Sequence, residues 1–176
     1  MARIVPLAEA DDPAVRTAID AIFFDSAATK TFASQDERAA YRELWLGRYL
    51  RHCPADCFVA LDAGGSVMGY LAGSLFSDRA PLAGPDYYTL CPPALVDIYP
   101  AHVHVNVRAD CRGREAGSEL VAAFRAHCGA NGIGGLHAVT TAGSKAASFF
   151  EHCGLAERAT ASWRDRQIVF LGESLD

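Results

Sequence analysis

One stretch of the chain constrains the fold more than any other, because an alternating strand, a short loop and an amphipathic helix follow one another there. In residues Ala101–Val107 the polar side chains of His102, His104 and Asn106 alternate with apolar ones, which is the two-residue period of a β-strand. The loop Arg112–Ser118 contains two glycines, and apolar residues then recur every four positions. This succession is typical of a protein in which helices pack on a sheet.

The apolar pattern predicts the other elements of the chain. Strands are expected at residues 2–7, 57–61, 67–75, 136–140 and 166–171, and helices at 13–24, 35–51 and 145–152. The order β-α-α-β-β-β-α-β-α-β predicts a mixed α/β sheet with helices on both faces. Because 176 residues are enough for one well-buried core, we predict a single domain spanning residues 1–176.

Two helix starts carry local signals. Asp12 is a good N-cap and Pro13 suits the first helical position. Ser34 and Glu37 form a capping box, in which the serine accepts a backbone hydrogen bond and the glutamate reaches back. We therefore expect one helix from Pro13 and another after Ser34. The apolar stripe predicted for the second helix consists of Tyr41, Leu44, Trp45 and Tyr49.

Three segments lack an apolar period and are predicted to be loops. They are Asp25–Ala33, Ser77–Pro93 and Thr160–Asp165. A loop as long as Ser77–Pro93 within a compact domain often has a function, so this segment is a candidate for ligand binding. A surface excursion without a function fits its sequence equally well.

Charge and composition disfavour several classes of partner. The formal net charge is −5 and there is no basic run, which disfavours nucleic acid and anionic membranes. No apolar run approaches the roughly 20 residues of a membrane span, and Met1–Ala10 does not have the pattern of a secretory signal. The six cysteines include no CxxC pair, so we expect reduced thiols and a cytoplasmic protein. Lys30 and Lys145 are the only lysines, and this preference for arginine suggests a GC-rich bacterial genome.

Two motifs in the C-terminal half resemble those of the GNAT superfamily of N-acetyltransferases. Residues Arg112–Gly117 resemble its Q/R-x-x-G-x-G/A loop between a strand and a helix, and Gly143–Leu155 resembles its N-x-x-A-x-x-F-Y-x-x-x-G-F segment. The resemblance covers roughly residues 98–156. It implies a central mixed sheet of six to seven strands flanked by about four helices. Within the superfamily, Tyr99–Asn106 is similar to the Y-P-A-H-L-H-I-D stretch of the acetyltransferase-like domain of O-GlcNAcase and its bacterial relatives.

The loop before the helix also suits a phosphate group on physical grounds. A helix N-terminus offers unpaired backbone N–H groups and the positive end of the helix dipole. Gly113 and Gly117 let the backbone approach a ligand, and Arg112 and Arg114 add positive charge. The loop is therefore expected to bind an anion such as a pyrophosphate.

The resemblance implies that the ligand is acetyl-CoA. Its pyrophosphate would lie on the loop, and its pantetheine arm would pair with Val105–Val107 where that strand splays from residues 136–140. The implied cofactor-binding residues are Val105, Asn106, Val107, Arg112, Gly113, Arg114, Glu115, Ala116, Gly117, Ser118, Gly143, Ala146 and Phe150.

The chain departs from the family pattern at four positions. Glu115 replaces a loop glycine, although a side chain turned to water would act as a first-turn acid of the helix. Phe150 replaces the tyrosine that in many relatives protonates the departing thiolate. Gly143 replaces an asparagine, and Asn106 replaces the aspartate of the O-GlcNAcase-like relatives. Together these changes weaken the case for efficient turnover.

Acetyl transfer to an amine requires a base, and the candidate catalytic residues are His104, His102, Asn106 and Asp97. Histidine is suited to proton transfer near neutral pH, and a water relay is the alternative base. Both histidines also fit a purely structural role. The His-x-His pair shares one strand face and could bind a metal, but no third ligand stands at a telling spacing, so no metal is expected.

Two functions from different classes follow. The first is an N-acetyltransferase that uses acetyl-CoA to acetylate a primary amine of a small molecule or protein by direct attack in a ternary complex. The second is a catalytically weak acyl-CoA-binding or interaction module on the same fold. The acceptor, which the sequence does not identify, is expected to bind the loops Asp25–Ala33, Ser77–Tyr99 and Thr160–Asp165. The aromatic residues Tyr87 and Tyr88 suggest a homodimer interface.

Overall fold

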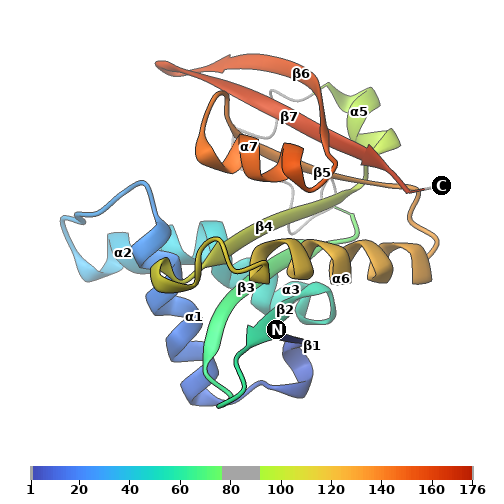
Figure 1. Cartoon of the computed structure of the whole chain (residues 1–176). Coiled ribbons are helices and arrows are strands. Elements are labelled where there is room, and N and C mark those ends of the chain that lie inside the picture. Colours follow the sequence, from blue (N-terminus) through green and yellow to red (C-terminus); the bar gives the residue numbers. More distant parts are fainter. Residues whose placement is uncertain (1, 77–91, 176) are drawn as a thin grey trace. The chain divides into compact units, whose positions relative to one another are not determined.

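The structure is a computed structural model that describes residues 2–76 and 92–175 (Figure 1). These residues form two compact units, residues 2–73 with 104–124, and residues 74–76 and 92–103 with 125–175. The strands have the order β1-β2-β3-β4-β5-β7-β6 in a seven-stranded sheet. Since the sheet contains both parallel and antiparallel pairs, the predicted mixed α/β fold class is confirmed. Residues 77–91 of the predicted loop Ser77–Pro93 lie outside the described residues. The two tyrosines of the expected dimer interface, Tyr87 and Tyr88, are among them.

The first unit contains the N-terminal strands and three helices. Its N-terminal elements are β1 (Arg3–Pro6), η1 (Leu7–Glu9), α1 (Pro13–Ser26), α2 (Gln35–Arg42), the π-helical turn η2 (Glu43–Gly47), α3 (Arg48–His52), η3 (Pro54–Asp56), β2 (Phe58–Leu61) and β3 (Val67–Ser74). The last residue of β3 belongs to the second unit. The first unit also contains the second half of β4 (Ala101–Val107), η4 (Ala109–Cys111) and the first part of α6 (Ala116–Ala130). Strand β2 pairs antiparallel with both β1 and β3.

Both predicted helix starts are confirmed by capping bonds. The Asp12 carboxylate accepts from the backbone N–H groups of Ala14 and Val15, at 2.7 and 2.9 Å. The Ser34 hydroxyl accepts from the Glu37 N–H at 3.1 Å, and the Glu37 carboxylate accepts from Ala33 N. Each cap satisfies N–H groups that the first helical turn leaves without a partner, so local sequence fixes where these helices begin.

The predicted apolar stripe of the second helix is partly wrong. Tyr49 is buried as expected, but the side chain of Leu44 is 38% exposed, and Leu46 and Leu50 are buried instead. The cause is the π-helical turn at Glu43–Gly47, which separates α2 from α3. A π turn has more residues than an α turn, so it rotates every following side chain relative to the expected 3.6-residue period.

The apolar face of α6 matches its prediction. Ala116, Leu120, Phe124 and Cys128 recur every four residues, and all four are buried. A Cβ atom at Gly73 would lie 2.5 Å from the Phe124 ring and 2.9 Å from the Asp56 carbonyl oxygen. The ring can therefore pack against β3 only because residue 73 is glycine.

The second unit contains the C-terminal strands. Its elements are α5 (Pro93–Ile98), the first half of β4, the end of α6, β5 (Gly135–Thr141), α7 (Lys145–His152), β6 (Ala156–Trp163) and β7 (Arg166–Ser174). Strand β7 pairs antiparallel with β5 and β6, and α7 packs on these three strands (Figure 1). The parallel pairing of β4 with β5 covers Ala101 and His102.

Two elements of the second unit differ from the sequence expectation. Strand β6 includes part of the segment Thr160–Asp165, which was predicted to be a loop. Its side chains are exposed or half-buried throughout, because it stands at the edge of the sheet and half of its residues are polar. Such a strand is stabilised by its pairing with β7, which no local apolar period reveals. The short helix α5 was also missed.

A buried stack of rings lies in the second unit. The imidazole of His137 stacks on that of His102 with a centroid separation of 4.7 Å and on the Phe170 ring at 4.5 Å. Its Nδ1–H donates to the Tyr99 carbonyl oxygen. Burial lowers the pKa of His137 from 6.5 to about 4, although the bond to Tyr99 opposes that change.

We expect this histidine to make the protein less stable in acid. Between pH 6.5 and about 4 the unfolded chain binds a proton at His137 that the folded chain excludes. His137 therefore makes its whole contribution to the free energy of unfolding above pH 6.5. This contribution falls by up to about 3 kcal/mol as the pH drops to 4 and does not change further below that pH. Urea denaturation of wild type and His137→Phe over this range measures the difference. The phenylalanine variant keeps a stacked ring and should lack this part of the slope, whereas parallel slopes would contradict the assignment.

Candidate functional site

His104 lies in the first unit at the start of the half-buried part of β4. Its Nε2 atom is 3.2 Å from the hydroxyl oxygen of Tyr49, which is buried in α3. The imidazole also meets the rings of Tyr49 and Trp45 edge to face, with centroid separations of 5.2 and 6.4 Å. A histidine that meets a polar partner and two aromatic rings has a defined orientation, as proton transfer requires.

Asn106 lies two residues further along the same strand. Its side-chain amide donates to the hydroxyl of Tyr70 at 2.8 Å. Tyr70 is buried in β3, and this burial raises the pKa of its hydroxyl well above the usual value of 10.0. Neither group accepts a proton near neutral pH, because an amide has no basic atom and the tyrosine stays protonated. The pair positions the strand but does not supply a base.

The other two candidate bases lie in the second unit. The side chain of His102 is 1% exposed and belongs to the ring stack with His137, which favours a structural role. Asp97 is exposed on α5. The structure thus places His104 and Asn106 beside Tyr49 and Tyr70, while the contacts described for His102 lie elsewhere. His104 is the best placed of the candidate bases.

The loop between β4 and α6 presents backbone N–H groups. Gly113 and Glu115 both have left-handed backbones, with φ angles of 77° and 63°. The first backbone bond of the helical ladder runs from Glu119 N to the Glu115 carbonyl at 2.9 Å. The N–H groups of Gly117 and Ser118 precede that bond, as in the first turn of any helix. The loop therefore has the backbone geometry of an anion-binding site.

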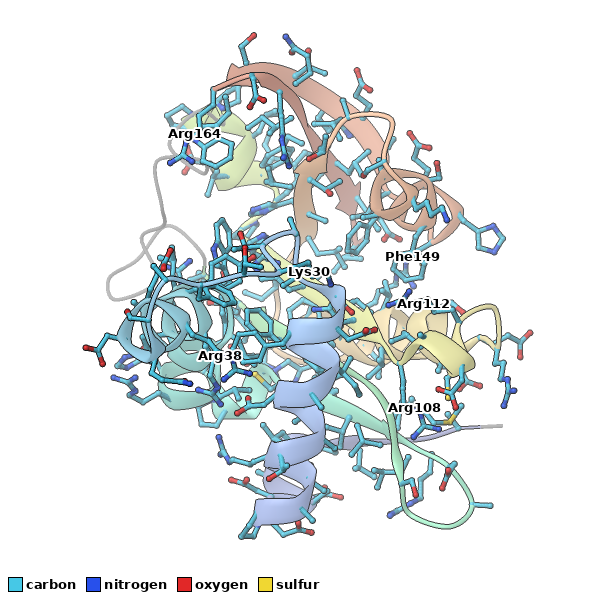
Figure 2. All side chains as sticks on the ribbon, turned by 90° about the vertical axis from the view of Figure 1, so that its left-hand side faces the viewer. Lys30, Arg38, Arg108, Arg112, Phe149 and Arg164 are labelled. Carbon is cyan, nitrogen blue, oxygen red and sulfur yellow. The ribbon has the colours of Figure 1, made fainter. Side chains whose placement is uncertain are left out.

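Arg112 ties this loop to the rest of the first unit. Its Nε donates to the Val107 carbonyl at 3.1 Å, and its Nη2 lies 3.4 Å from the Ser26 hydroxyl and 3.5 Å from an Asp25 carboxylate oxygen (Figure 2). These partners join the end of β4 to the end of α1. Arg112, Gly113, Arg114 and Glu115 are all exposed, so the loop is open to a ligand.

Replacing Glu115 with glycine is expected to stabilise the fold. The left-handed conformation costs an L-residue about 1–2 kcal/mol, and the greater chain entropy of glycine offsets about 0.5–1 kcal/mol of the gain. We therefore expect the free energy of unfolding to rise by about 0.5–1 kcal/mol in urea denaturation. Glu115→Ala is the matched control, because it removes the charge and keeps the Cβ. A gain shared equally by both variants would trace the effect to the charge instead of the backbone.

The remaining implied cofactor-binding residues are in the second unit. Gly143 is exposed in the turn before α7 with a φ of 67°. The Ser144 hydroxyl caps α7 by accepting from Ala147 N at 3.1 Å. Ala146 is exposed on this helix, whereas Phe150 is buried and meets Phe149 edge to face. Since Phe150 has no hydroxyl, this position cannot donate a proton.

Metal-binding and membrane-spanning features were sought in the part of the chain that the structure describes. Residues 2–76 and 92–175 contain no group of three or more histidine, cysteine or acidic side chains placed to hold a metal ion. Within the same ranges, no helix is both long and apolar enough to cross a membrane.

Three residues that contact His104, Asn106 or Tyr49 were not recognised from the sequence as site residues. Tyr49 was predicted only as part of an apolar stripe, and Tyr70 and Arg48 were not singled out. Tyr49 is 55 positions from His104 and Tyr70 is 36 from Asn106, so no local pattern could link them. The sequence offered one signal for this group, because the charged residue Arg48 precedes Tyr49, a member of the predicted apolar stripe.

Comparison with known families identifies one match. The family model described as acetyltransferase (GNAT) family matches residues 19–155, a range that includes the loop at Arg112–Ser118 and both histidines of β4. A comparison with curated proteins finds no match.

Several solved structures share the fold. The crystal structure of SsHAT is 21% identical, with a TM-score of 0.74 and coverage of 99% of this chain and 98% of that one. An N-acetyltransferase from Staphylococcus aureus Mu50 is 22% identical, with a TM-score of 0.65 and coverage of 100% and 99%. A phosphinothricin acetyltransferase from Sinorhizobium meliloti, in complex with AcCoA, is 18% identical, with a TM-score of 0.62 and coverage of 99% and 88%. The comparisons support the resemblance at the level of the GNAT family, and the finer likeness of Tyr99–Asn106 to the O-GlcNAcase domain and its bacterial relatives stays a prediction.

Proposed function

Because the chain belongs to the acetyltransferase (GNAT) family, a family of acetyl-CoA-dependent N-acetyltransferases, we propose that it acetylates a primary amine of a small molecule or protein. The observation that carries this proposal is the open loop Arg112–Ser118, whose backbone N–H groups lead into α6 directly after the strand that holds His104. The loop would bind the cofactor, and β4, which directly precedes it in the chain, would supply His104 as the base.

Acetyl-CoA is the proposed donor. Its pyrophosphate would accept hydrogen bonds from the N–H groups that open α6, and Arg112 and Arg114 would add positive charge. The complex of the phosphinothricin acetyltransferase with AcCoA supports this choice of ligand. Residues Val105–Val107 would pair with the pantetheine arm, and Gly143, Ala146 and Phe150 would contribute from the second motif.

The proposed reaction is direct attack of the amine on the thioester in a ternary complex. The amine must lose a proton before it attacks, and His104 would receive it, directly or through a water, while Tyr49 holds the ring. A backbone N–H of β4 would stabilise the oxyanion. Bringing both substrates together supplies much of the acceleration, so the missing hydroxyl at Phe150 need not abolish turnover. Asn106 would orient the strand, and His102 and Asp97 are the weaker candidates for the base.

A two-step experiment tests this function. Calorimetric titration measures the binding of acetyl-CoA, and an assay of free thiol then measures acetyl transfer to a panel of primary amines. We expect binding and amine-dependent release of CoA. Failure to bind acetyl-CoA would overturn the proposal.

The alternative function is a catalytically weak acyl-CoA-binding or interaction module. It is favoured by three departures from the family motifs, namely Glu115 in the loop, Asn106 in the strand and Phe150 in α7. Binding of acetyl-CoA without transfer to any amine would support this alternative over the enzyme.

We also propose that residues 1–176 act as one domain. The family match crosses both compact units, and β4 and α6 each run from one unit into the other. A homodimer and a cytoplasmic location remain predictions from the sequence, to be tested by light scattering and by cell fractionation.

A further inference from the structure

A buried arginine lies beside the candidate base. Arg48 is the first residue of α3, and only 8% of its surface is exposed. Its Nη2 atom lies 3.5 Å from the Tyr49 hydroxyl oxygen, a long contact, and its Nε is buried without a hydrogen-bond partner. Among residues 2–76 and 92–175, no acidic side chain forms an ion pair with Arg48.

Such an arginine is costly unless an anion joins it. A guanidinium stays charged at any pH of interest, so it cannot escape burial by losing its proton. A buried charge without a partner destabilises the folded protein, whereas a carboxylate can accept two parallel bonds from the guanidinium fork. The unsatisfied Nε–H at Arg48 therefore marks a place suited to a carboxylate.

The position of Arg48 relates this place to the reaction. The Tyr49 hydroxyl oxygen lies 3.5 Å from Nη2 of Arg48 and 3.2 Å from Nε2 of His104. A ligand that places an amine at His104 and an anion at Arg48 would need only a short spacer between the two groups. The half-buried ring of Trp45, which meets the His104 imidazole, offers aromatic surface for that spacer.

The backbone geometry agrees with a functional role for this segment. The π-helical turn Glu43–Gly47 ends directly before Arg48 and sets the direction of Arg48 and Tyr49. π-helical turns within helices occur frequently at functional sites, although they cost backbone hydrogen-bond quality.

Building on the proposed function, we propose that Arg48 binds a carboxylate of the acceptor, which is therefore an amine that also carries a carboxylate group. As the bond between the amine nitrogen and the acetyl carbon forms, the bond from that carbon to the CoA sulfur would break. The amine proton would pass to His104, and CoA would leave as a thiolate that takes up a proton from solvent. The carboxylate takes no part in bond making. Its role is to hold the acceptor with its amine toward the base.

The test compares amino acids with their own carboxamides as acceptors, including α-, β- and γ-amino compounds. In each pair the group that Arg48 would bind is charged in the acid and neutral in the carboxamide. For the best pair we expect wild type to prefer the acid by at least about 10-fold in kcat/KM, as is typical for a hydrogen bond to a charged group. Equal use of acid and amide, or transfer to amides alone, would overturn the proposal and leave the acetyltransferase function standing.

Variants of Arg48 test whether this residue causes the preference for acids over carboxamides. In Arg48→Met we expect the KM for the acid to rise about 10- to 100-fold while the KM for the amide and the affinity for acetyl-CoA stay unchanged. Arg48→Lys should recover part of the preference, because it restores a charge without the fork. Arg51→Met is the matched control, since Arg51 is exposed on the same helix and pairs with Glu43.

The outcomes separate the two proposals. If the wild-type protein does not bind acetyl-CoA, the proposed function is wrong. If it transfers acetyl groups equally well to acids and amides, only the carboxylate site is wrong. Should Arg48→Met fail to fold, as judged by circular dichroism, the wild-type comparison of acids and amides still decides the proposal. An unchanged preference in a folded Arg48→Met would also refute it.

Discussion

Replacing Gly117 with glutamate is expected to weaken acetyl-CoA binding by about 100-fold or more. Gly117 lies in the first turn of α6, where its N–H group precedes the helical hydrogen-bond ladder. A carboxylate about 4 Å from the pyrophosphate would cost up to roughly 4 kcal/mol at an effective dielectric of 20, and tenfold in affinity corresponds to about 1.4 kcal/mol. Calorimetric titration of wild type and variant measures the change.

Two further variants separate local repulsion from general damage. Gly129→Glu makes the same substitution near the other end of α6, where a Cβ would meet nothing within 4 Å, and should leave the affinity unchanged. Because Gly117 is buried, Gly117→Ala provides a gentler change that adds only a methyl group and should weaken binding less. Equal affinity of wild type and folded Gly117→Glu would place the pyrophosphate elsewhere.

Replacing His104 with glutamine is expected to lower kcat for acetyl transfer by about 100- to 10,000-fold, the usual contribution of a general base. Glutamine can still meet the Tyr49 hydroxyl but cannot take up a proton. The affinity for acetyl-CoA should not change, because the imidazole contacts Tyr49 and Trp45 and is not part of the anion-binding loop. Steady-state kinetics on any accepted amine, together with calorimetry, measure both quantities.

His152→Gln is the control for this substitution. His152 is exposed at the end of α7, so the same change there should leave kcat unaltered. If kcat survives in His104→Gln, the base is a water relay or another group, and His104 has only a structural role. Tyr49→Phe adds a graded test, since it keeps the ring contact and removes the hydroxyl that orients the imidazole.

The sequence determined those elements whose causes lie within a few residues of each other. β4 and α7 have the predicted bounds, and α6 buries the predicted face. Strict alternation, a capping serine and a four-residue apolar repeat each act over one or two turns or a short strand, so they can be recognised without knowledge of the fold. The left-handed backbone of Glu115 was not predicted, although the residue stands where the family motif has glycine.

The tertiary structure decided what depends on distant partners. β6 is polar and acquires its strand structure by pairing with β7. The π turn before Arg48 shifted the buried face of its helix, so Leu46 and Leu50 replaced Leu44 in the core. In the candidate site, His104 meets a tyrosine 55 positions away, and that tyrosine lies next to a buried arginine. Hydrogen bonding and desolvation act through space, so the spacing of residues along the chain cannot reveal which polar groups the fold buries together.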